Sequence, residues 1–394
     1  MRLGLFFLVV AYVLSQFYRA FLAVLTPMLE ADIGATADDL ATASGLWFLV
    51  FACMQIPVGW ALDTVGPRRT AGVLLALGAA GGAFVFAGAS SPAHISVAMV
   101  LIGIGCSPVL MSSYYIFAKV YSPAVFATLA GAVIGIGSLG NLAGSVPMAW
   151  AVEAFGWRET LAGLGVVTLV VAVALMVFIT DPPRDEIAPK GSVLDLLRLP
   201  ALWFIFPLMF VNYAPSAGIR GLWIGPYLSD VYGLDAGGIG QITLVMGLAM
   251  ILGNFVYGPL DRLLPSRKWI VFTGNALGAL ACFALYWVPA GTLTYAAILL
   301  AAIGFFGASF PVVIAHAKEF FPAHLTGRGV TLLNLFGIGG VGIMQVVTGR
   351  VHSATQGATA DPYQAIFGLF GLLVVAGLAV YLFAKERPVS APRG

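Results

Sequence analysis

The stretch GWALDTVGPRR, residues 59–69, places one acidic residue, two glycines and two arginines between two long apolar segments. Those segments, near 40–62 and 69–89, each hold roughly 20 predominantly apolar residues, the length that an α-helix needs to cross a bilayer. A short charged loop between two such segments is typical of two membrane-spanning helices that turn back on each other. The stretch therefore predicts a helical membrane protein.

The composition of the whole chain agrees with a membrane location. Of 394 residues, 60% are hydrophobic and 9% are charged, whereas a soluble chain carries about 25% charged residues. The net charge is +2 and the basic residues are scattered through short loops, so the charge gives no indication of nucleic-acid binding, and we expect none. The three cysteines, Cys53, Cys106 and Cys282, lie in apolar segments, so we expect reduced packing residues and neither a disulfide nor a metal site. No motif implies a cofactor.

Apolar windows of this length recur along the chain and predict twelve spans. They lie near 4–29, 40–62, 69–89, 93–117, 124–152, 158–180, 201–230, 237–260, 269–289, 292–317, 325–350 and 363–384. The longest polar stretch, 180–200, lies at the centre of the chain. We therefore expect an all-α membrane protein whose twelve transmembrane helices form two pseudo-symmetric six-helix bundles, 1–180 and 201–394, joined by a linker at 181–200.

The basic residues set the expected orientation in the membrane. Most of them fall in the N-terminus, the even-numbered loops and the short C-terminal tail. The positive-inside rule then places both termini and the linker in the cytoplasm, with the protein in the plasma (inner) membrane.

The two predicted bundles repeat one another in sequence at a constant offset of 199 positions. The matched pairs include Pro27 and Pro226, Gly59 and Gly258, Arg68 and Arg267, and Lys119 and Lys318. Six helices between equivalent points preserve the topology, so the repeats are parallel and related by an axis along the membrane normal. Such repeats place a substrate near the bilayer midplane, between the two bundles.

The loop between the second and third spans resembles the signature loop of the major facilitator superfamily. Gly59 is followed after three residues by Asp63, after two more by Gly66, and after one more by Arg68 and Arg69. The loop also has the family's position in the chain, and the resemblance covers the whole sequence. It implies a cytoplasmic latch, in which Asp63 pairs with basic residues or a helix N-terminus when that side of the protein is closed.

Two cations, Arg19 and Arg220, lie within the predicted spans, while the acidic residues fall in loops or at helix ends. A charged side chain inside a membrane costs roughly 2.5–3.5 kcal/mol on insertion scales, so it needs a partner or a purpose. A ligand could supply the missing negative charge, because a guanidinium matches the oxygens of a carboxylate, phosphate or sulfonate. The arrangement resembles the organic-anion and organophosphate antiporter branch of the superfamily, which has an arginine on helices one and seven.

Helical spacing adds further candidates around the two arginines. Tyr12 and Gln16 share a helix face with Arg19, and the seventh span carries polar and aromatic residues three or four positions apart. The candidate binding residues are Tyr12, Gln16, Arg19, Trp47, Tyr114, Tyr213, Ser216, Arg220, Trp223, Tyr227 and Asn334, with Tyr115 and Gln345 as weaker ones.

The repeat does not align the two arginines. At the offset of 199 positions, Arg19 matches Gly218, and Arg220 matches Phe21. The seventh span holds Pro215 and several glycines, so we expect an irregular or hinged backbone there. Either that irregularity corrects the mismatch, or only one arginine binds the ligand.

These features predict a secondary transporter of a small organic anion that works by alternating access. We expect a monomer and no enzymatic activity, since no nucleophile–base pair or metal constellation is visible. Two alternatives stay open. The substrate could be a larger amphipathic or zwitterionic solute, such as a peptide, vitamin or siderophore, bound mainly by Trp47, Trp223 and the tyrosines. The protein could also be a transporter-like membrane sensor, although the chain shows only short loops and no added cytoplasmic domain.

Overall fold

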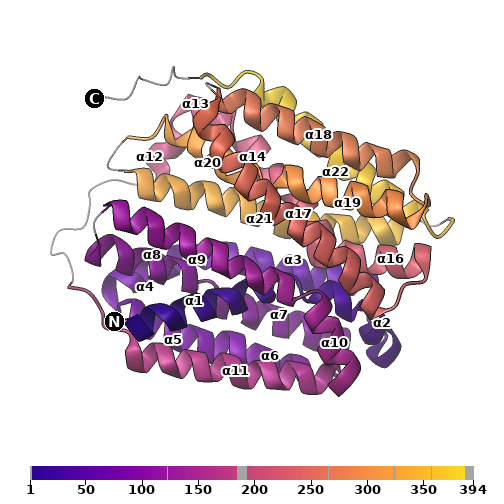
Figure 1. The fold of residues 1–394 in the computed structure, drawn as a ribbon, viewed down its shortest axis with the longest axis horizontal. Helices are drawn as coiled ribbons and strands as arrows, with labels where there is room; N and C mark the ends of the chain where they lie inside the picture. Colours follow the sequence, from indigo (N-terminus) through magenta and orange to yellow (C-terminus); the bar gives the residue numbers. More distant parts are fainter. Residues whose placement is uncertain are drawn as a thin grey trace. The chain divides into compact units, whose positions relative to one another are not determined.

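The computed structural model describes residues 2–121, 123–183, 193–264, 266–322, 325–355 and 357–386. Much of the predicted linker, residues 184–192, and most of the predicted tail, residues 387–394, lie outside the described residues. The regular elements of the described residues are all helical, which confirms the predicted all-α class (Figure 1).

The helices before the linker are α1 (Arg2–Phe17), α2 (Leu22–Ile33), α3 (Ala37–Cys53), α4 (Gln55–Thr64), α5 (Pro67–Leu74), η1 (Leu75–Ala80), α6 (Gly81–Ala87), α7 (Pro92–Cys106), α8 (Val109–Val120), α9 (Pro123–Ala143), α10 (Val146–Phe155) and α11 (Trp157–Phe178). Those after it are α12 (Val193–Leu197), α13 (Pro200–Trp203), α14 (Phe206–Asn212), α15 (Ala214–Gly218), η2 (Ile219–Trp223), α16 (Ile224–Tyr232), α17 (Ala236–Leu263), α18 (Arg267–Trp287), α19 (Leu293–Gly307), α20 (Phe310–Lys318), α21 (Thr326–Ala354) and α22 (Asp361–Tyr381).

Within the described ranges, ten helices are long and apolar enough to cross a membrane. The number reaches the predicted twelve when each of two bent pairs is counted as one span. One pair, Leu3–Phe17 with Leu22–Ile33, is bent by 52°, and the other, Leu129–Ala143 with Val146–Phe155, by 43°. The chain therefore has the spans of a multi-pass membrane protein.

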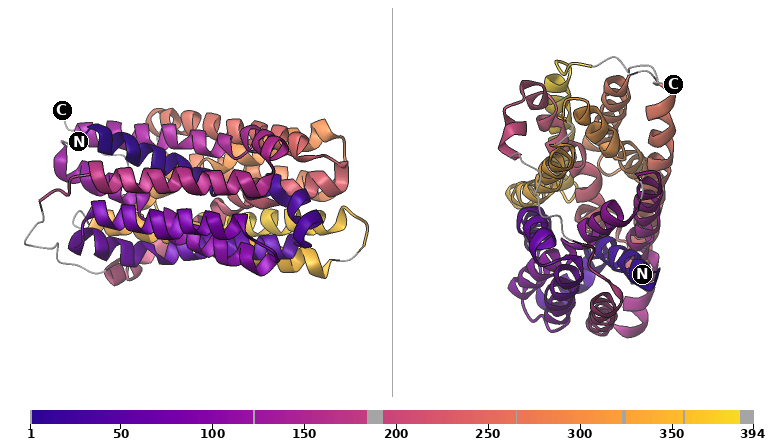
Figure 2. Two further views of the ribbon diagram at one scale, coloured as in Figure 1. Left: turned by 90° about the horizontal axis from the view of Figure 1, so that it is seen from below. Right: turned by 90° about the vertical axis from the view of Figure 1, so that its left-hand side faces the viewer.

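The chain divides into two compact units, each of which is described by itself. Unit 1 comprises Met1–Glu186, Arg220–Leu244 and Gly342–Ser353, and unit 2 comprises the remaining segments. Within each unit the long helices run side by side (Figure 2). The break between the units falls inside the predicted linker, but two segments of the later sequence pack with unit 1. Two separate six-helix bundles remain a prediction.

Both intramembrane arginines lie where the helical backbone is irregular. Arg19 lies in the break between α1 and α2, where its amide donates to the carbonyl oxygen of Gln16 at 3.4 Å, a shorter-range bond than the α-helical one. Arg220 lies in η2, a π-helical turn within the seventh span. The predicted irregularity of that span is confirmed, since it is divided into five helical segments. π-turns and helix breaks of this kind are frequent at functional sites.

Close backbone contacts hold the first helix break in unit 1. A Cβ at Gly140 of α9 would meet the carbonyl oxygen of Val13, and one at Gly225 of α16 would meet that of Ala23. Helices α9 and α16 can approach α1 and α2 this closely only because these positions lack a side chain. In unit 1, helices α9 and α16 therefore pack directly against the backbone on the two sides of the break that contains Arg19.

Unit 2 is built on α18, which packs against α19 and α22. Its core includes large buried side chains such as Phe206 and Tyr381. A buried polar network crosses this core: the Asn212 amide donates to Asn275 Oδ1 at 2.6 Å and to Ser309 Oγ at 2.9 Å. This network ties α14, α18 and the start of α20 into one body, although Asn212 Oδ1 has no hydrogen-bond partner among the described residues.

Candidate functional site

Arg19 presents its guanidinium to two aromatic rings of α3. The guanidinium carbon lies 4.7 Å from the centroid of the Phe51 ring and 5.3 Å from that of Trp47. The two rings are stacked on each other, 5.1 Å apart at 16°. Arginine therefore lies against a rigid aromatic surface, and cation–π attraction of about 0.5–2 kcal/mol holds it there.

Two hydrogen-bond donors of this cluster have no acceptor. The buried Nε of Arg19 and the indole Nε1 of Trp47 lack a hydrogen-bond partner among the described residues. No salt bridge of Arg19 is found in the same part of the chain. Trp47 is 1% exposed, so water does not readily satisfy its indole. Buried donors without acceptors are costly, and here they are grouped beside a cation.

Tyr12 and Gln16 lie on α1 as the helical spacing predicts. The Gln16 side-chain amide donates to the Tyr12 hydroxyl at 3.1 Å, and both residues are largely buried. A Cβ at Gly137 of α9 would meet the Tyr12 ring, so the tyrosine packs between α1 and α9. These two side chains extend a polar strip along α1 toward the break that holds Arg19.

Arg220 is 4% exposed and reaches α9. It donates to the side-chain oxygen of Asn141 at 3.0 Å and also to the carbonyl oxygen of Asn141. Asn141 lies in the last turn of α9, where carbonyl groups are left without helical partners and carry partial negative charge. The end of a broken helix thus compensates the Arg220 charge. Asn141 is not among the residues predicted from the sequence, where its signal is a polar residue just before the Gly144-Ser145 break.

The aromatic residues that follow Arg220 are packed inside unit 1. The Trp223 indole donates to Thr348 Oγ1 at 2.8 Å, and its ring lies 5.2 Å from that of His352. The Tyr227 hydroxyl lies 3.3 Å from that of Tyr232. Trp223 and Tyr227 therefore have hydrogen-bond partners within the protein, whereas none is found for the Trp47 indole among the described residues.

Gln345, one of the weaker candidates, also lies in unit 1. Its amide donates to Ser44 Oγ at 3.2 Å, which joins α21 to α3. Tyr114 and Tyr115 of α8 are half-buried, and the Lys119 ammonium lies 5.8 Å from the Tyr115 ring.

The remaining candidates lie in unit 2. The Tyr213 ring is 5.2 Å from that of Phe310, and the Ser216 hydroxyl donates to the Tyr213 carbonyl oxygen at 3.2 Å. Ser216 is fully buried and Asn334 is half-buried. These three candidates are grouped with unit 2, and their role as ligands stays a prediction.

The 59–69 loop is held by Asp181, a residue that lies outside the predicted site. Gly66 has a φ of +99°, a conformation that favours glycine, and a Cβ there would meet the Asp181 carboxylate. Asp181 Oδ1 accepts from the Arg68 amide at 2.8 Å at the start of α5. A carboxylate at a helix N-terminus is stabilising. In the described part of the chain Asp63 makes no comparable bond, and it is exposed, as are Gly59 and Arg69.

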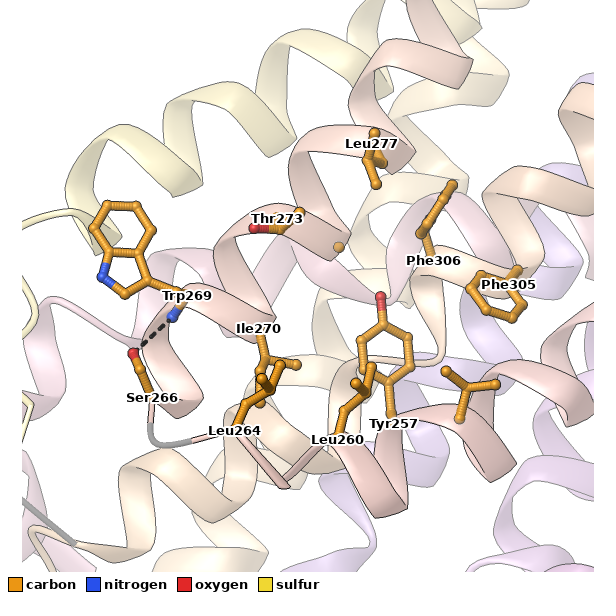
Figure 3. A pocket seen from close by; sticks show the side chains of 12 residues that line it. Tyr257, Leu260, Leu264, Ser266, Trp269, Ile270, Thr273, Leu277, Phe305 and Phe306 are labelled. Atoms are coloured by element: carbon orange, nitrogen blue, oxygen red, sulfur yellow. Dashed lines mark hydrogen bonds between the residues drawn. The ribbon is translucent and has the colours of Figure 1, made fainter. Parts of the chain in front are cut away.

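A cavity of about 380 Å³ lies in unit 2 between α17, α18 and α19 (Figure 3). Its lining is apolar apart from Ser266, Thr273 and the Tyr257 hydroxyl. None of the predicted site residues lines it.

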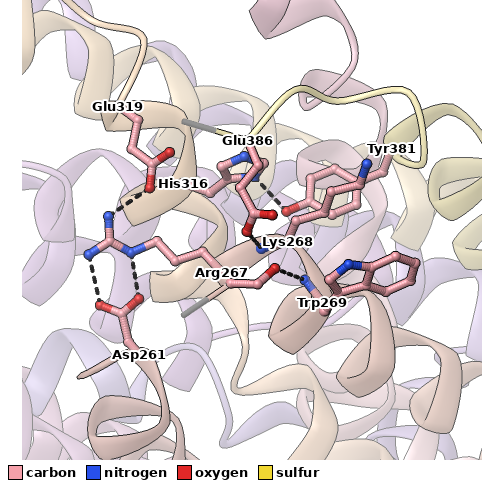
Figure 4. Close-up of polar contacts among 9 residues, drawn as sticks. Asp261, Arg267, Lys268, Trp269, His316, Glu319, Tyr381 and Glu386 are labelled. Atoms are coloured by element: carbon pink, nitrogen blue, oxygen red, sulfur yellow. Dashed lines mark hydrogen bonds and ion pairs between the residues drawn. The ribbon is translucent and has the colours of Figure 1, made fainter. Parts of the chain in front are cut away.

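A charged cluster lies at the start of α18 in unit 2 (Figure 4). Arg267 donates to Asp261 Oδ1 at 2.6 Å and to Glu319 Oε1 at 2.9 Å, so one cation joins α17, α18 and the end of α20. Beside it, His316 Nδ1 lies 2.6 Å from the Tyr381 hydroxyl, which ties α20 to α22. The sequence repeat matches Arg267 to Arg68, but it does not indicate the two carboxylate partners of Arg267.

A family model described as Major Facilitator Superfamily matches residues 8–222 and 205–394. Among curated relatives, the "Probable L-galactonate transporter" of Escherichia coli is 22% identical over 97% of this chain and 89% of its own. The "Probable sulfoacetate transporter SauU" of Cupriavidus necator is 24% identical over 94% and 91%. The "Probable transporter SCO4007" of Streptomyces coelicolor is 27% identical over 64% of this chain. The match covers 55% of that relative, so this chain spans about half of its length.

Solved structures share the fold. A bacterial homologue of the human lysosomal transporter Spinster, in an inward-facing and occupied conformation, has a TM-score of 0.75, with 18% identity and 96% of each chain covered. A D-xylose–proton symporter has a TM-score of 0.78, with 14% identity and 97% of each chain covered. At these identities the likeness extends to the fold.

Proposed function

We propose that this chain, which belongs to the major facilitator superfamily, carries a small organic anion with a carboxylate, phosphate or sulfonate group. Family membership makes the protein a multi-pass membrane transporter and not an enzyme. The proposal concerns its substrate class and the residues that bind it. The observation that supports both is the unpaired Arg19 cation beside the unpaired Trp47 indole.

The energies at Arg19 favour an added anion. Inserting an arginine costs roughly 2.5–3.5 kcal/mol on insertion scales. Its cation–π contacts with Phe51 and Trp47 offset about 0.5–2 kcal/mol of that insertion cost. Charge-assisted hydrogen bonds contribute about 1.5–3 kcal/mol, which is enough to cover the remainder. A bound anion would therefore convert a costly side chain into a satisfied one.

The geometry also favours an anion with more than one oxygen. A guanidinium presents parallel donors, and the Trp47 indole adds one more from the same cluster. A neutral amphipathic solute would leave the charge of Arg19 without a partner. We therefore assign Arg19 the primary role, with Trp47 and Gln16 as neighbouring ligands.

Arg220 is proposed as a secondary ligand. Its bonds to Asn141 use two of its five N–H donors, so an anion at Arg220 either shares the guanidinium with Asn141 or exchanges with it. That exchange would connect substrate binding to the α9–α10 break, because Asn141 lies just before it. Tyr12, Tyr114, Tyr213, Ser216, Trp223, Tyr227 and Asn334 remain proposed ligands of lower rank.

The printed names of two relatives agree with this substrate class. Galactonate is a carboxylate, and sulfoacetate combines a carboxylate with a sulfonate. We further propose that both termini face the cytoplasm and that the protein works as a monomer by rocking of its two halves. The predicted spans carry acidic residues only at their ends, Glu159 and Asp230, so exchange, facilitated diffusion or co-transport of a protonated ligand fits better than proton symport through a carboxylate.

A matched-pair thermal-shift screen tests the substrate class. Purified protein is heated with L-galactonate against L-galactose, and with sulfoacetate against its uncharged diamide, in which both the carboxylate and the sulfonate are converted to amides. A ligand that binds the folded state raises the melting temperature by mass action. We expect anions to raise it and their neutral partners to leave it unchanged. Equal shifts with charged and neutral partners, or shifts only with peptides or amphipathic solutes, would favour the reading centred on Trp47 and Trp223.

A further inference from the structure

The groove between α17, α18 and α19 opens on the surface of the membrane-spanning part of unit 2. Its rim includes Leu264, Trp269 and Leu277, which are 47%, 54% and 40% exposed. Exposed leucines on a spanning helix face lipid more favourably than water, since lipid tails are as apolar as leucine. Leu277 lies on the spanning helix α18, so the lining of this groove favours a membrane component over an aqueous solute as its occupant.

The groove has the length of one leaflet. Along α18 it extends from Ser266, at the helix N-terminus, to Leu277. At about 1.5 Å of rise per residue this stretch covers roughly 16 Å, about half of a hydrocarbon core that is ~30 Å thick. Its volume of about 380 Å³ is within the range of pockets that hold small molecules, about 300–1,000 Å³. A single acyl chain that lies along α18 fits both dimensions.

The end of the groove at residue 266 has the polarity of a membrane interface. Ser266 accepts from the Trp269 amide at 3.3 Å, and the Trp269 indole ring is exposed, as interfacial tryptophans are. The Lys268 ammonium lies 6.0 Å from the centre of that ring. One of its three donors reaches the Leu382 carbonyl oxygen at 2.7 Å, and no other partner is found for it among the described residues. The Glu386 carboxylate accepts from the Lys268 backbone amide at 3.4 Å, so the remaining ammonium donors are those available to a phosphate.

A hydroxyl lies inside the groove. The Tyr257 side chain occupies its middle, with Leu260 and Leu264 on one side and Phe305 and Phe306 on the other (Figure 3). In the described part of the chain its hydroxyl has no hydrogen-bond partner. It could donate to an ester oxygen, a group that a phospholipid carries between its headgroup and its acyl chains.

We propose that this groove binds one acyl chain of an anionic phospholipid, with the headgroup phosphate at Lys268 and Trp269. The proposal does not depend on the substrate of the transporter. It uses residues of unit 2, whereas the proposed anion site is centred on Arg19 in unit 1.

Native mass spectrometry of the purified full chain tests the site. Dioleoyl phosphatidylglycerol and dioleoyl phosphatidylcholine are titrated against wild type, Leu277→Trp and Leu280→Trp. The two leucines lie three positions apart on α18 and are both exposed, but Leu280 does not line the groove. We expect Leu277→Trp to remove the tightest bound phosphatidylglycerol and Leu280→Trp to retain it. Equal retention or equal loss in the two variants would overturn the site.

A third variant, Lys268→Gln, tests whether the lipid headgroup lies at Lys268. Loss of one lysine near an anionic headgroup should weaken phosphatidylglycerol binding about fivefold and leave phosphatidylcholine binding unchanged. Equal weakening of both lipids would contradict the headgroup assignment. A photoreactive acyl chain added to the wild-type protein gives a readout that is independent of variant folding. It should label residues of the groove, such as Tyr257 and Phe306, and labelling confined to other helices would refute the proposal.

Discussion

Replacing Arg19 should separate ligand binding from protein stability. In Arg19→Gln the cation is lost, so the contacts with Phe51 and Trp47 are lost too, about 0.5–2 kcal/mol. The cost of burying the charge, roughly 2.5–3.5 kcal/mol, disappears at the same time. The ligand-free variant should therefore be as stable as wild type or slightly more stable. The anion loses charge-assisted hydrogen bonds of about 1.5–3 kcal/mol, so its affinity should fall roughly ten- to a hundredfold.

Arg158→Gln is the matched control, because Arg158 also lies over a tryptophan. Its guanidinium carbon is 4.1 Å from the Trp157 ring, but it also bonds the carbonyl oxygens of Ala87 and Ala89 and lies 3.7 Å from Asp32. Its loss should lower the melting temperature and leave anion affinity unchanged. The two variants thus differ in opposite ways. Arg19→Gln should lower anion affinity without lowering stability, whereas Arg158→Gln should lower stability without lowering anion affinity.

The assay combines thermal shift without ligand with uptake of the best anion into proteoliposomes. Arg19→Lys should recover only part of the uptake, since lysine keeps the charge and loses the planar fork. Binding by Arg19→Gln within about twofold of wild type would refute the reasoning, since a charge-assisted contact is worth at least about tenfold. A large fall in the melting temperature of ligand-free Arg19→Gln would also show that the arginine is a structural residue.

Three further predictions concern single substitutions. Asn141→Ala removes the side-chain acceptor of Arg220 and should lower stability by about 1.5–3 kcal/mol in denaturant unfolding, while anion affinity rises if Arg220 is also a ligand. Gly66→Ala places a Cβ at a backbone position with positive φ, where it would clash with the Asp181 carboxylate. The substitution should lower stability by about 1–2 kcal/mol and increase hydrogen exchange at the start of α5. Arg267→Gln leaves two carboxylates without their shared cation and should lower stability by about 1–2 kcal/mol, with an effect that weakens at high salt.

The signature loop shows how far a local pattern can be interpreted. The spacing of Gly59, Asp63 and Gly66 indicated the family, and the family model confirms it. It also suggested Asp63 as the charged partner in the latch, a role that stays a prediction. The carboxylate that caps α5 here is Asp181, which is more than a hundred positions away in sequence. No local spacing contains such a contact, because it depends on how α11 ends beside α5.

The sequence by itself determined the membrane location, the all-helical class, the approximate spans and the isolation of Arg19 and Arg220 from acidic residues. These properties follow from composition and from the lengths of the apolar segments. A segment inside the bilayer must satisfy its backbone hydrogen bonds internally, so it forms a helix. The tertiary structure decided what each arginine contacts. Arg19 lies against aromatic rings of α3 and has no acceptor among the described residues, while Arg220 bonds the end of α9 at Asn141. The difference arises because the two helix breaks point the side chains toward different neighbours, and helix packing, not helical periodicity, sets that direction.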